Sequence, residues 1–524
     1  YQVQTVTLET YPGFYLTGTL FLPPGEGPFP AILSPHGHWS EGRFEDIERA
    51  SIPGRALNFA KRGFAVFSYS MIGYNETEDF FPHRFDTPQY QLWGFSAMGL
   101  QLWNSIRALD YLGSRKEVDA DRIGMTGASG GGTQTFLLTA IDDRIRVAAP
   151  VNMISAHFQG GCICENAPLL RHSINNVEIG SLAAPRPLLL VSTSGDWTLN
   201  TPNLEFPAIQ QIYSLFDASS RVENAHFDYP HNYNKATRES VYTWFEKWLG
   251  NQTSSEQESP FILPPSTTAN AVLPDTPLSE PQLFASFKAQ GTQHLLLNTP
   301  TSWSQLNTFK ASYGRALEHS LYVEEELPVE LTTVKATDHT AASDAILIIH
   351  GSSGESHQKA KKIAEAYSAK GILAAMLTNT NSLDGFNQPI DSVSYWTTYN
   401  PTFAQAKVHR IISAARTLNA RPDVRHVDLI GLDDAGAHTL LARSQLSFIR
   451  TTQVDFNGLA YESDDIFLKH LQIPLLRRAG DFKTAVAMTV PGSLTIQNLP
   501  NSELKSWIRR LYNELGAGDM LSFE

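Results

Sequence analysis

Residues 121–134, D-R-I-G-M-T-G-A-S-G-G-G-T-Q, are the stretch that decides the fold. Residues 127–131 fit G-x-S-x-G, a pattern in which a serine occupies a tight turn between a buried strand and a helix. The glycines let the backbone bend so sharply that only the hydroxyl of Ser129 projects. Residues 122–126 are apolar and strand-like, and residues 133–140 have helical length. We therefore predict that Ser129 lies at the positive end of a helix, which favours the anion formed in acyl transfer.

Two residues that a serine nucleophile needs follow Ser129 in the order acid, then histidine. The apolar run 187–192 leads into Asp196, and the strand-like run 222–227 leads into His231. An imidazole takes the serine proton and returns it to the leaving group, while a carboxylate fixes the imidazole tautomer. This chain order is that of the α/β-hydrolases. It predicts an acyl-transfer site made of Ser129, Asp196 and His231.

Two alternatives to these partners remain open. Glu165 is an alternative acid, because its loop also follows a predicted strand, residues 146–151. His226 is a rival base, but it lies inside a predicted strand and is better explained as a structural residue.

Upstream, the predicted strand 30–34 runs into His36-Gly37-His38, where the N–H after the glycine can point at a substrate carbonyl oxygen.

The first half of the chain resembles the acetyl xylan esterase-like α/β-hydrolases. The segments that carry the resemblance are H-G-H-W-S-E-G-R (36–43), G-A-S-G-G-G-T-Q-T (127–135), G-G-C-I-C-E-N-A-P (160–168), A-P-R-P-L-L-L-V-S (184–192), G-D-W-T (195–198) and H-N-Y (231–233). The resemblance covers about residues 1–250 and implies Ser129, Asp196 and His231 as the triad. It also implies the N–H groups of Gly130 and His38 as the oxyanion hole. It does not fix the substrate, because functions on this fold vary widely.

The second half repeats the pattern of elements without repeating the chemistry. The apolar run 345–349 ends in His350-Gly351, and the strand-like run 426–430 leads into a Gly-rich turn with Asp433 where a serine would stand. No histidine follows His470. We predict a mostly parallel α/β architecture with helices on both faces for residues 1–250, a Ser/Thr/Pro-rich linker over 251–280, and a degenerate, non-catalytic α/β-hydrolase-like domain over 281–524. Its expected role is stability, a homo-oligomer contact, or one wall of the substrate cleft.

Composition limits the partners and cofactors. The 524 residues carry a net charge of −13 without a basic block, so nucleic acid is not expected as a partner. No apolar run is long enough to cross a bilayer. The two cysteines, Cys162 and Cys164, are predicted to be buried free thiols. Nearby His157 and His172 raise the question of zinc, but the spacing matches no standard finger, so neither metal nor cofactor is expected. The chain does not begin with Met, and a periplasmic or secreted location is expected.

The leading functional hypothesis is a serine carboxylic ester hydrolase that removes acyl groups from a polysaccharide or oligosaccharide. A methyl esterase acting on uronic acids, or a peptidase, would use the same triad. Arg43, Arg84 or Arg171 beside Ser129 would favour uronates. A glycan-binding or scaffold protein with a retired hydrolase fold is the non-enzymatic alternative. Candidate substrate-binding residues are Trp39, Arg43, Tyr74, Arg171 and Trp197.

Overall fold

The computed structural model describes residues 1–250, 257–258, 260–274, 276–322, 329–334, 343–378 and 395–524. The chain divides into two compact units. Unit 1 comprises Tyr1–Asp86, Ser96–Ala167 and Ser173–Ala285, and unit 2 comprises Thr87–Phe95, Pro168–His172 and Ser286–Glu524. Two short segments from the first half of the chain therefore belong to unit 2.

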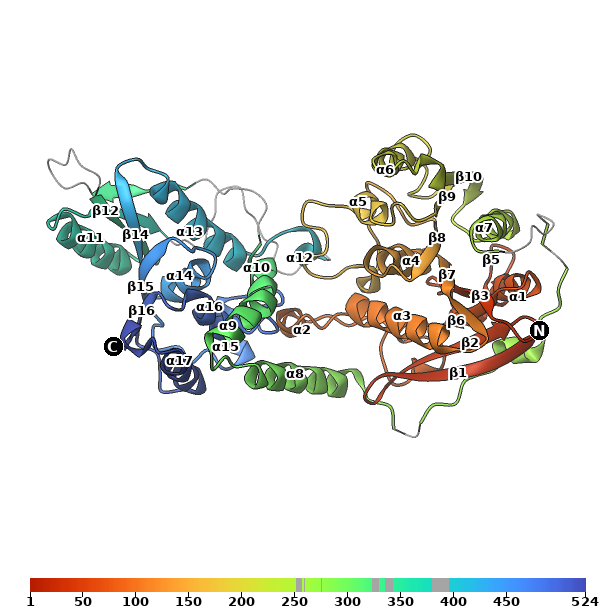
Figure 1. The fold of residues 1–524 in the computed structure, drawn as a ribbon, viewed down its shortest axis with the longest axis horizontal. Helices are drawn as coiled ribbons and strands as arrows, with labels where there is room; N and C mark the ends of the chain where they lie inside the picture. The colour runs from red at the N-terminus through yellow and green to blue at the C-terminus, as the bar shows by residue number, and fades with distance from the viewer. Residues whose placement is uncertain (251–256, 259, 275, 323–328, 335–342, 379–394) are drawn as a thin grey trace. The chain divides into compact units, whose positions relative to one another are not determined.

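Unit 1 is built on an eight-stranded sheet in the order β1-β2-β6-β3-β7-β8-β9-β10 (Figure 1). β1 and β2 pair antiparallel, β2 runs antiparallel to β6, and the other neighbours are parallel. The strands are β1 Gln2–Tyr11, β2 Phe14–Leu22, β3 Phe29–Leu33, β6 Ala65–Tyr69, β7 Val118–Ala128, β8 Ile145–Val151, β9 Leu188–Gly195 and β10 Val222–Pro230, with a separate hairpin of β4 Asp46–Ile47 and β5 Ala50–Ser51.

Helices cover both faces of this sheet. Val66 of β6 belongs to a core that α1 (Ile52–Lys61) and α7 (Lys235–Trp248) complete on one face. Its neighbour Phe67 points to the opposite face, because successive strand residues alternate, and there it contacts Tyr111 of α3 (Ala97–Ser114). The remaining helices of unit 1 are α4 Gly130–Ile141, α5 Asn176–Ser181 and α6 Glu205–Ser214. The predicted α/β fold with helices on both faces is confirmed.

Unit 2 repeats this plan with a seven-stranded sheet in the order β11-β13-β12-β14-β15-β16-β17. Only β11 is antiparallel to its neighbour. Ile346 and Ile348 of β12 pack on α11 (Gly354–Ser368), and Leu347 between them is equally buried on the other face. The strands are β11 Thr332–Val334, β12 Ser343–His350, β13 Leu373–Thr378, β14 Val424–Gly431, β15 Ile449–Asp455, β16 Ser493–Gln497 and β17 Leu521–Phe523.

The segment Thr87–Phe95 is an integral part of unit 2. It forms α2 (Pro88–Trp93), whose Gln89 and Trp93 side chains both donate hydrogen bonds to the buried Asp464 of α15, at 3.0 and 3.1 Å. Lys288 of α8 pairs with the same carboxylate at 2.5 Å. The other helices are α8 Glu280–Leu297, α9 Trp303–Phe309, α10 Arg315–Leu321, α12 Trp396–Tyr399, α13 Phe403–Asn419, α14 Ala435–Arg443, α15 Asp464–His470, α16 Asp481–Thr489 and α17 Glu503–Glu514.

Part of the predicted linker 251–280 lies outside the described residues. Its described part packs on unit 1 instead of spanning open space. Glu258 forms a buried ion pair with Arg238, and the Leu278 N–H donates to the carbonyl of Gly13 at 2.8 Å. The limits of the predicted domains remain a prediction.

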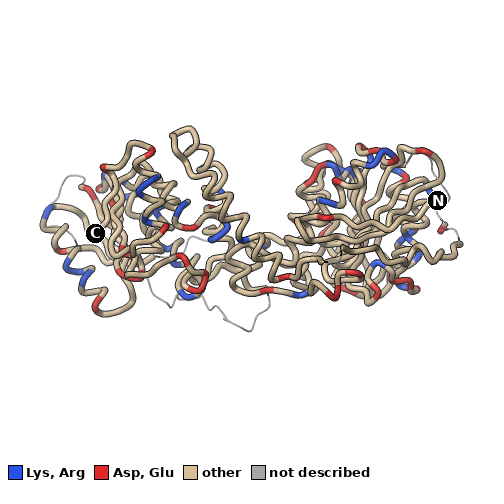
Figure 2. Tube along the Cα trace, turned by 90° about the horizontal axis from the view of Figure 1, so that it is seen from below, with Lys and Arg blue, Asp and Glu red and all other residues tan. Residues whose placement is uncertain are grey.

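Charges of both signs are mixed along the chain, and Figure 2 shows no large region of one sign. Among the described residues, no helix combines the length and the apolarity needed to span a bilayer.

Candidate active site

Ser129 lies on a sharp turn between β7 and α4, as the motif predicts. Its φ of 56° and ψ of −123° are unusual for a residue with a side chain. Neighbouring glycines make the turn sterically feasible. A Cβ on Gly127 or on Gly131 would lie 2.7 Å from the carbonyl oxygen of Pro35. Ser129 is half-buried, and its hydroxyl has no hydrogen-bond partner among the described residues. It is therefore available to a substrate.

Asp196 and His231 meet beyond the carboxyl ends of β9 and β10. His231 Nδ1 lies 2.7 Å from Asp196 Oδ2, so Nδ1–H donates and Nε2 is left as the basic nitrogen. The other carboxylate oxygen accepts hydrogen bonds from the N–H and hydroxyl of Thr198, at 2.7 and 2.5 Å. Burial acts to raise the pKa of Asp196, but the hydrogen bonds from His231 and Thr198 outweigh it and hold that pKa below its usual value. The carboxylate therefore stays ionised.

Ser129 and the Asp196–His231 pair lie at the same edge of the sheet. Ala128 is in register with Val151 of β8, and Val151 with Val191 of β9. No hydrogen bond joins Ser129 to His231 in the part of the chain that the structure describes. Such bonds are often long in free enzymes and tighten when substrate binds.

Glu165 occupies a different environment from Asp196. Its carboxylate accepts the N–H groups of Gly161 and Cys162 at 2.9 and 3.0 Å, and Thr133 donates to it at 3.3 Å. Burial raises its pKa. Two of these donors belong to the loop of Glu165 itself, and the third, Thr133, belongs to α4. His226, the rival base, contacts the hydroxyls of Ser192 and Ser194.

The loop His36-Gly37-His38 packs directly on the serine turn. A Cβ on Gly37 would lie 2.6 Å from the carbonyl oxygen of Ala128 and 3.1 Å from the Cβ of Ser129. The ring of His38 packs on Gly130, where an added Cβ would meet ring Cε1 at 2.9 Å. The backbone of residue 37 and the ring of His38 therefore pack closely against the serine turn.

The buried side chain of His36 holds this loop through two hydrogen bonds. Its Nδ1–H donates to the Gly37 carbonyl at 2.7 Å, and its Nε2 accepts the Met71 N–H at 2.9 Å. Burial lowers the pKa of His36 to about 3. The ring is therefore neutral and has a single tautomer.

Several residues expected to bind substrate have other environments. Arg43 is a correction: it is fully buried and forms an ion pair with Glu76, with a second hydrogen bond to Ser70. A loop arginine looks exposed in a sequence because its partner, Glu76, lies far along the chain. Arg171 is also buried, in unit 2, and its N–H donates to the Thr398 carbonyl at 2.9 Å.

The aromatic candidates lie close to the histidines. The ring centroids of Trp197 and Trp39 are 4.5 and 6.5 Å from that of His231. Tyr74 packs edge-on against His83 at 4.9 Å, and burial raises its pKa to about 12. The exposed Arg84 acts electrostatically on Tyr74, where its charge opposes that rise.

A cluster that the sequence analysis missed lies in the same unit. The donor atoms of His38, His83, Cys162 and Cys164 all lie within 4.8 Å of one another. Both cysteines are buried free thiols, as predicted. The histidines differ from His157 and His172, the two that sequence proximity suggests. The signal was the C-x-C pair itself, but its partners are 79 and 126 residues away along the chain.

Unit 2 has its own turn after β14, with Asp433 at φ 52°. The Asp433 carboxylate accepts hydrogen bonds from Ser356 at 2.6 Å and Lys359 at 2.9 Å. Burial acts to raise the pKa of Asp433, but these two donors lower it overall. A cavity of about 410 Å³ beside it is lined by Ser352, Ser353, Glu355, Ser356, Lys359, Asp433, Asp434 and Asn457.

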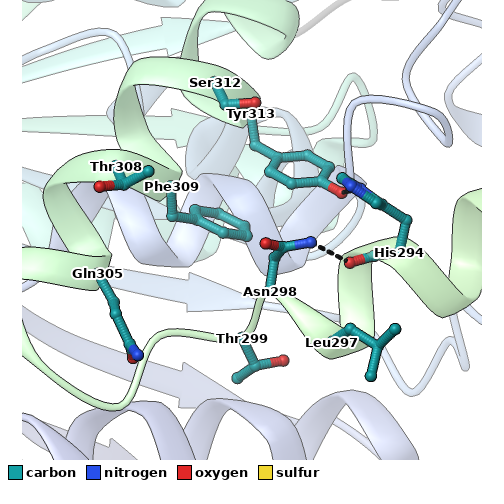
Figure 3. Close-up of a pocket in the computed structure, with 9 residues that line it drawn as sticks. All are labelled: His294, Leu297, Asn298, Thr299, Gln305, Thr308, Phe309, Ser312 and Tyr313. Atoms are coloured by element: carbon teal, nitrogen blue, oxygen red, sulfur yellow. Dashed lines mark hydrogen bonds between the residues drawn. The ribbon is translucent and has the colours of Figure 1, made fainter.

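A second cavity of unit 2, of about 250 Å³, is bordered by α8, α9 and the turn after α9 (Figure 3). Tyr313 stacks on Phe309 with centroids 4.6 Å apart, and its hydroxyl lies 2.6 Å from His294 Nδ1. Asn298 donates to the His294 carbonyl at 2.8 Å. Three of the polar residues that line this cavity, His294, Asn298 and Tyr313, are therefore already paired with one another.

The mostly parallel sheet, the serine turn and the order of the site residues define an α/β-hydrolase fold for unit 1. Residues 1–165 match the acetyl xylan esterase family, which confirms the resemblance over that stretch.

Individual relatives are more distant. The Bacillus subtilis (strain 168) protein YtaP is 31% identical over 184 residues, which are 31% of this chain and 59% of YtaP. Acyl-coenzyme A thioesterase 3 of Mus musculus is 31% identical over 134 residues, 26% of this chain and 25% of the thioesterase. The chain thus spans less than two thirds of either curated relative. The solved structure of methylesterase BT1017 is 32% identical, with a TM-score of 0.46, over 56% of this chain and 66% of that one.

Proposed function

We propose that unit 1 is a serine carboxylic ester hydrolase that removes acyl groups from a polysaccharide or oligosaccharide. The observation that carries the proposal is the 2.7 Å hydrogen bond between His231 and the ionised Asp196, at the sheet edge where Ser129 projects from its turn. The family match over residues 1–165 supports an ester as the substrate.

The proposed reaction has two halves. His231 Nε2 takes the hydroxyl proton as Ser129 Oγ attacks the ester carbonyl carbon, and the carbonyl oxygen becomes an oxyanion. The N–H groups of Gly130 and His38, and the positive end of α4, stabilise that oxyanion. The intermediate then collapses: the bond between the carbonyl carbon and the sugar oxygen breaks, and His231 gives its proton to that oxygen, which leaves as a sugar hydroxyl.

Water completes the cycle. His231 removes a proton from water, which attacks the acyl–Ser129 ester, and the second tetrahedral intermediate releases the free acid and regenerates the serine hydroxyl. Asp196 stays ionised throughout and stabilises the imidazolium that forms twice. These proposed steps use only side chains, backbone N–H groups and water.

A carbohydrate substrate is supported by the aromatic surroundings of His231. Trp197 is half-buried, and it packs on the imidazole and on Phe158, whose centroid is 4.4 Å away. An indole beside the catalytic base offers an apolar face to a sugar ring. A polysaccharide substrate also implies a periplasmic or secreted location, which belongs to this proposal.

One observation favours a second candidate, a methyl esterase acting on uronic acids. Arg84 is exposed, and its charge acts on both His38 and Tyr74. A guanidinium near the oxyanion loop is suited to binding a sugar carboxylate. The two candidates differ in which product carries the new acid: acetate is released in one case, and methanol in the other.

The experiment has two arms. The intact protein is treated with a fluorophosphonate, and we expect a single adduct that maps to Ser129. Absence of labelling would favour a retired fold. The protein is then incubated with acetylated xylan, methyl-esterified uronates and short peptides, and acetate, methanol and new amines are measured. Acetate release supports the main proposal, methanol release the second candidate, and new amines alone would exclude both.

For unit 2 we propose a non-catalytic role. Both oxygens of Asp433 are engaged by Ser356 and Lys359, so this carboxylate is held as an ion-pair partner. Homo-oligomer formation through this unit is part of the proposal and can be measured by light scattering.

A further inference from the structure

Four side chains of unit 1 bring two imidazoles and two thiols together. His38 Nε2 lies 3.2 Å from Cys164 Sγ, and His83 Nε2 lies 3.4 Å from Cys162 Sγ. All four donor atoms lie within 4.8 Å of one another. The thiols are buried and the imidazoles half-buried. Three loops, far apart in sequence, contribute to this cluster.

We propose that His38, His83, Cys162 and Cys164 form a binding site for one zinc ion. Two imidazoles and two thiolates are a common tetrahedral ligand set for Zn²⁺. With metal–ligand bonds of about 2.0–2.3 Å, neighbouring donors of such a tetrahedron are about 3.3–3.8 Å apart. The nitrogen–sulfur distance of 3.4 Å lies within this range and that of 3.2 Å lies just below it. No two donor atoms are more than 4.8 Å apart, so zinc binding requires the most distant donors to approach by about 1 Å.

The hydrogen bonding of His83 suits a metal ligand. Its Nδ1 lies 2.7 Å from the Ile72 carbonyl oxygen, which only accepts, so Nδ1 carries the proton. Nε2 is then unprotonated and faces Cys162. A backbone carbonyl that holds the far nitrogen in this way fixes the ring orientation and the tautomer of metal-bound histidines.

The ligand chemistry selects among metals. The cluster contains no carboxylate, and the nearby Glu165 is engaged by the N–H groups of Gly161 and Cys162. Magnesium and calcium prefer oxygen ligands, whereas thiolates favour zinc. Four protein ligands leave no open position, so the site is structural and takes no direct part in the ester chemistry.

The position of the cluster shows what a zinc ion would stabilise. The ring of His38 packs on Gly130, so a metal on His38 Nε2 would hold the loop that supplies the proposed oxyanion N–H. The two segments that belong to unit 2 begin at Thr87 and Pro168, each four residues after a ligand, His83 and Cys164. The ion would therefore hold together the three loops that contain His38, His83 and the Cys162–Cys164 pair.

The first test measures metal content. The full chain is produced without a histidine tag, dialysed against metal-free buffer, and analysed by plasma mass spectrometry. We expect about one zinc per chain. Cys162→Ser and Cys164→Ser should each weaken zinc binding by more than about 100-fold, beyond the loss typical of residues that only support a ligand. His157→Gln, an exposed histidine outside the cluster, is the matched control and should keep its zinc.

A second measurement covers variants that do not fold. Zinc is removed from the wild-type chain with a chelator and replaced by Co²⁺, whose visible bands report tetrahedral geometry and whose near-ultraviolet band reports thiolate ligands. Chelation should also lower the melting temperature. The inactive Ser129→Ala variant should bind the same zinc, so this test is independent of the proposed ester hydrolysis.

The opposite results are equally clear. No measurable zinc in the wild-type chain, both as purified and after incubation with excess Zn²⁺, would overturn the proposal and leave a hydrogen-bonded thiol–imidazole cluster. A full equivalent of zinc in a folded Cys162→Ser, Cys164→Ser double variant would place the metal elsewhere. A cobalt spectrum without the thiolate band would do the same.

Discussion

The two turns at Ser129 and Asp433 share a positive φ and differ in chemistry. Each turn follows the strand next to the one that leads into His-Gly, and the two φ values are 56° and 52°. His36 and His350 both donate from Nδ1 to the carbonyl of the next glycine at 2.7 Å. The Ser129 hydroxyl, however, is unpaired among the described residues, whereas both Asp433 oxygens accept hydrogen bonds. A strained turn is thus a property of the fold and does not by itself identify a catalyst.

The surroundings of the two turns explain the difference. The strand two places beyond the serine turn's strand is β9, and Asp196 after it binds His231. The corresponding strand of unit 2 is β16, and Asn498 after it donates to Asp455 at 2.9 Å. Asp455 also lies 3.6 Å from Lys359. Among the described residues of unit 2, the groups around the turn therefore form a polar network that contains no imidazole–carboxylate pair like that of His231 and Asp196.

The largest effect should come from the two turn residues themselves. We expect Ser129→Ala to lower kcat by about 10⁶-fold, because the nucleophile is lost. Asp433→Asn should leave kcat unchanged, because unit 2 is proposed to be non-catalytic. Hydrolysis of an aryl acetate, followed at saturating substrate, measures both.

A stronger form of this comparison adds a serine to the second turn. Asp433→Ser in the Ser129→Ala background should restore no activity, because no imidazole–carboxylate pair faces residue 433 among the described residues. Recovered turnover in that double variant would contradict the proposed role of unit 2.

The next largest effect concerns the acid. Asp196→Asn should lower kcat by about 10⁴-fold, since the amide stabilises the wrong tautomer of His231. Glu165→Gln should cost far less activity, because its carboxylate contacts its own loop. A melting curve of each variant separates lost folding from lost chemistry, and a reversed order of the two effects would make Glu165 the acid.

A smaller effect should follow from filling the space at the two His-Gly loops. In Gly37→Ala the new Cβ meets the Ala128 carbonyl at 2.6 Å, so the backbone of the serine turn must move. We expect kcat to fall by about 100-fold, the cost of a misplacement near 1 Å. In Gly351→Ala the nearest atom is the side-chain oxygen of Asp434, which can rotate away.

The measurement is kcat together with the unfolding free energy of each variant. Gly351→Ala should leave kcat unchanged and cost less stability than Gly37→Ala. Equal kcat in the two variants would show that residues 37–38 do not need close packing on the turn.

The smallest effect is on the pH dependence of stability. Burial lowers the pKa of His36 to about 3 from an ordinary value of 6.5, so between these values the unfolded state binds more protons. The unfolding free energy of unit 1 should therefore fall as the pH falls through this window, by up to about 1.4 kcal/mol per pH unit.

His36→Gln should remove this slope from the transition of unit 1. Burial likewise lowers the pKa of His438 in unit 2 to about 3. His438→Gln should therefore change only the unfolding transition of unit 2. Urea unfolding at pH 7 and pH 5 measures both, and an unchanged slope in His36→Gln would show that folding does not lower the pKa of His36.

Local patterns were enough to predict much of this molecule. The apolar runs that end in His36-Gly37, Ser129 and Asp196 all became strands that end at one edge of the sheet. Such patterns work because a strand buried on both faces must be continuously apolar, and because parallel strands align their carboxyl ends. The repeated pattern in the second half was visible for the same reason.

The remainder depends on contacts between residues that are far apart in sequence. Arg43 looked like a surface arginine because nothing nearby in sequence reveals its buried pairing with Glu76. The two-histidine, two-cysteine cluster was missed because three separate loops supply its members. The sequence analysis predicted no helix at Pro88–Trp93, and no local feature shows that this helix joins the core of unit 2.

Unit 2 is assembled from three separate segments of the chain, and this affects which fragments can fold and how the unit forms during translation. A fragment that starts at Ser286 would lack Gln89 and Trp93, and Asp464 would lose two of its donors. During translation, the segments Thr87–Phe95 and Pro168–His172 are therefore synthesised long before Ser286–Glu524, so they can reach their native contacts only after that part is made. Recombination at a single breakpoint between the two halves would separate residues that share one core, so we expect it to destabilise unit 2.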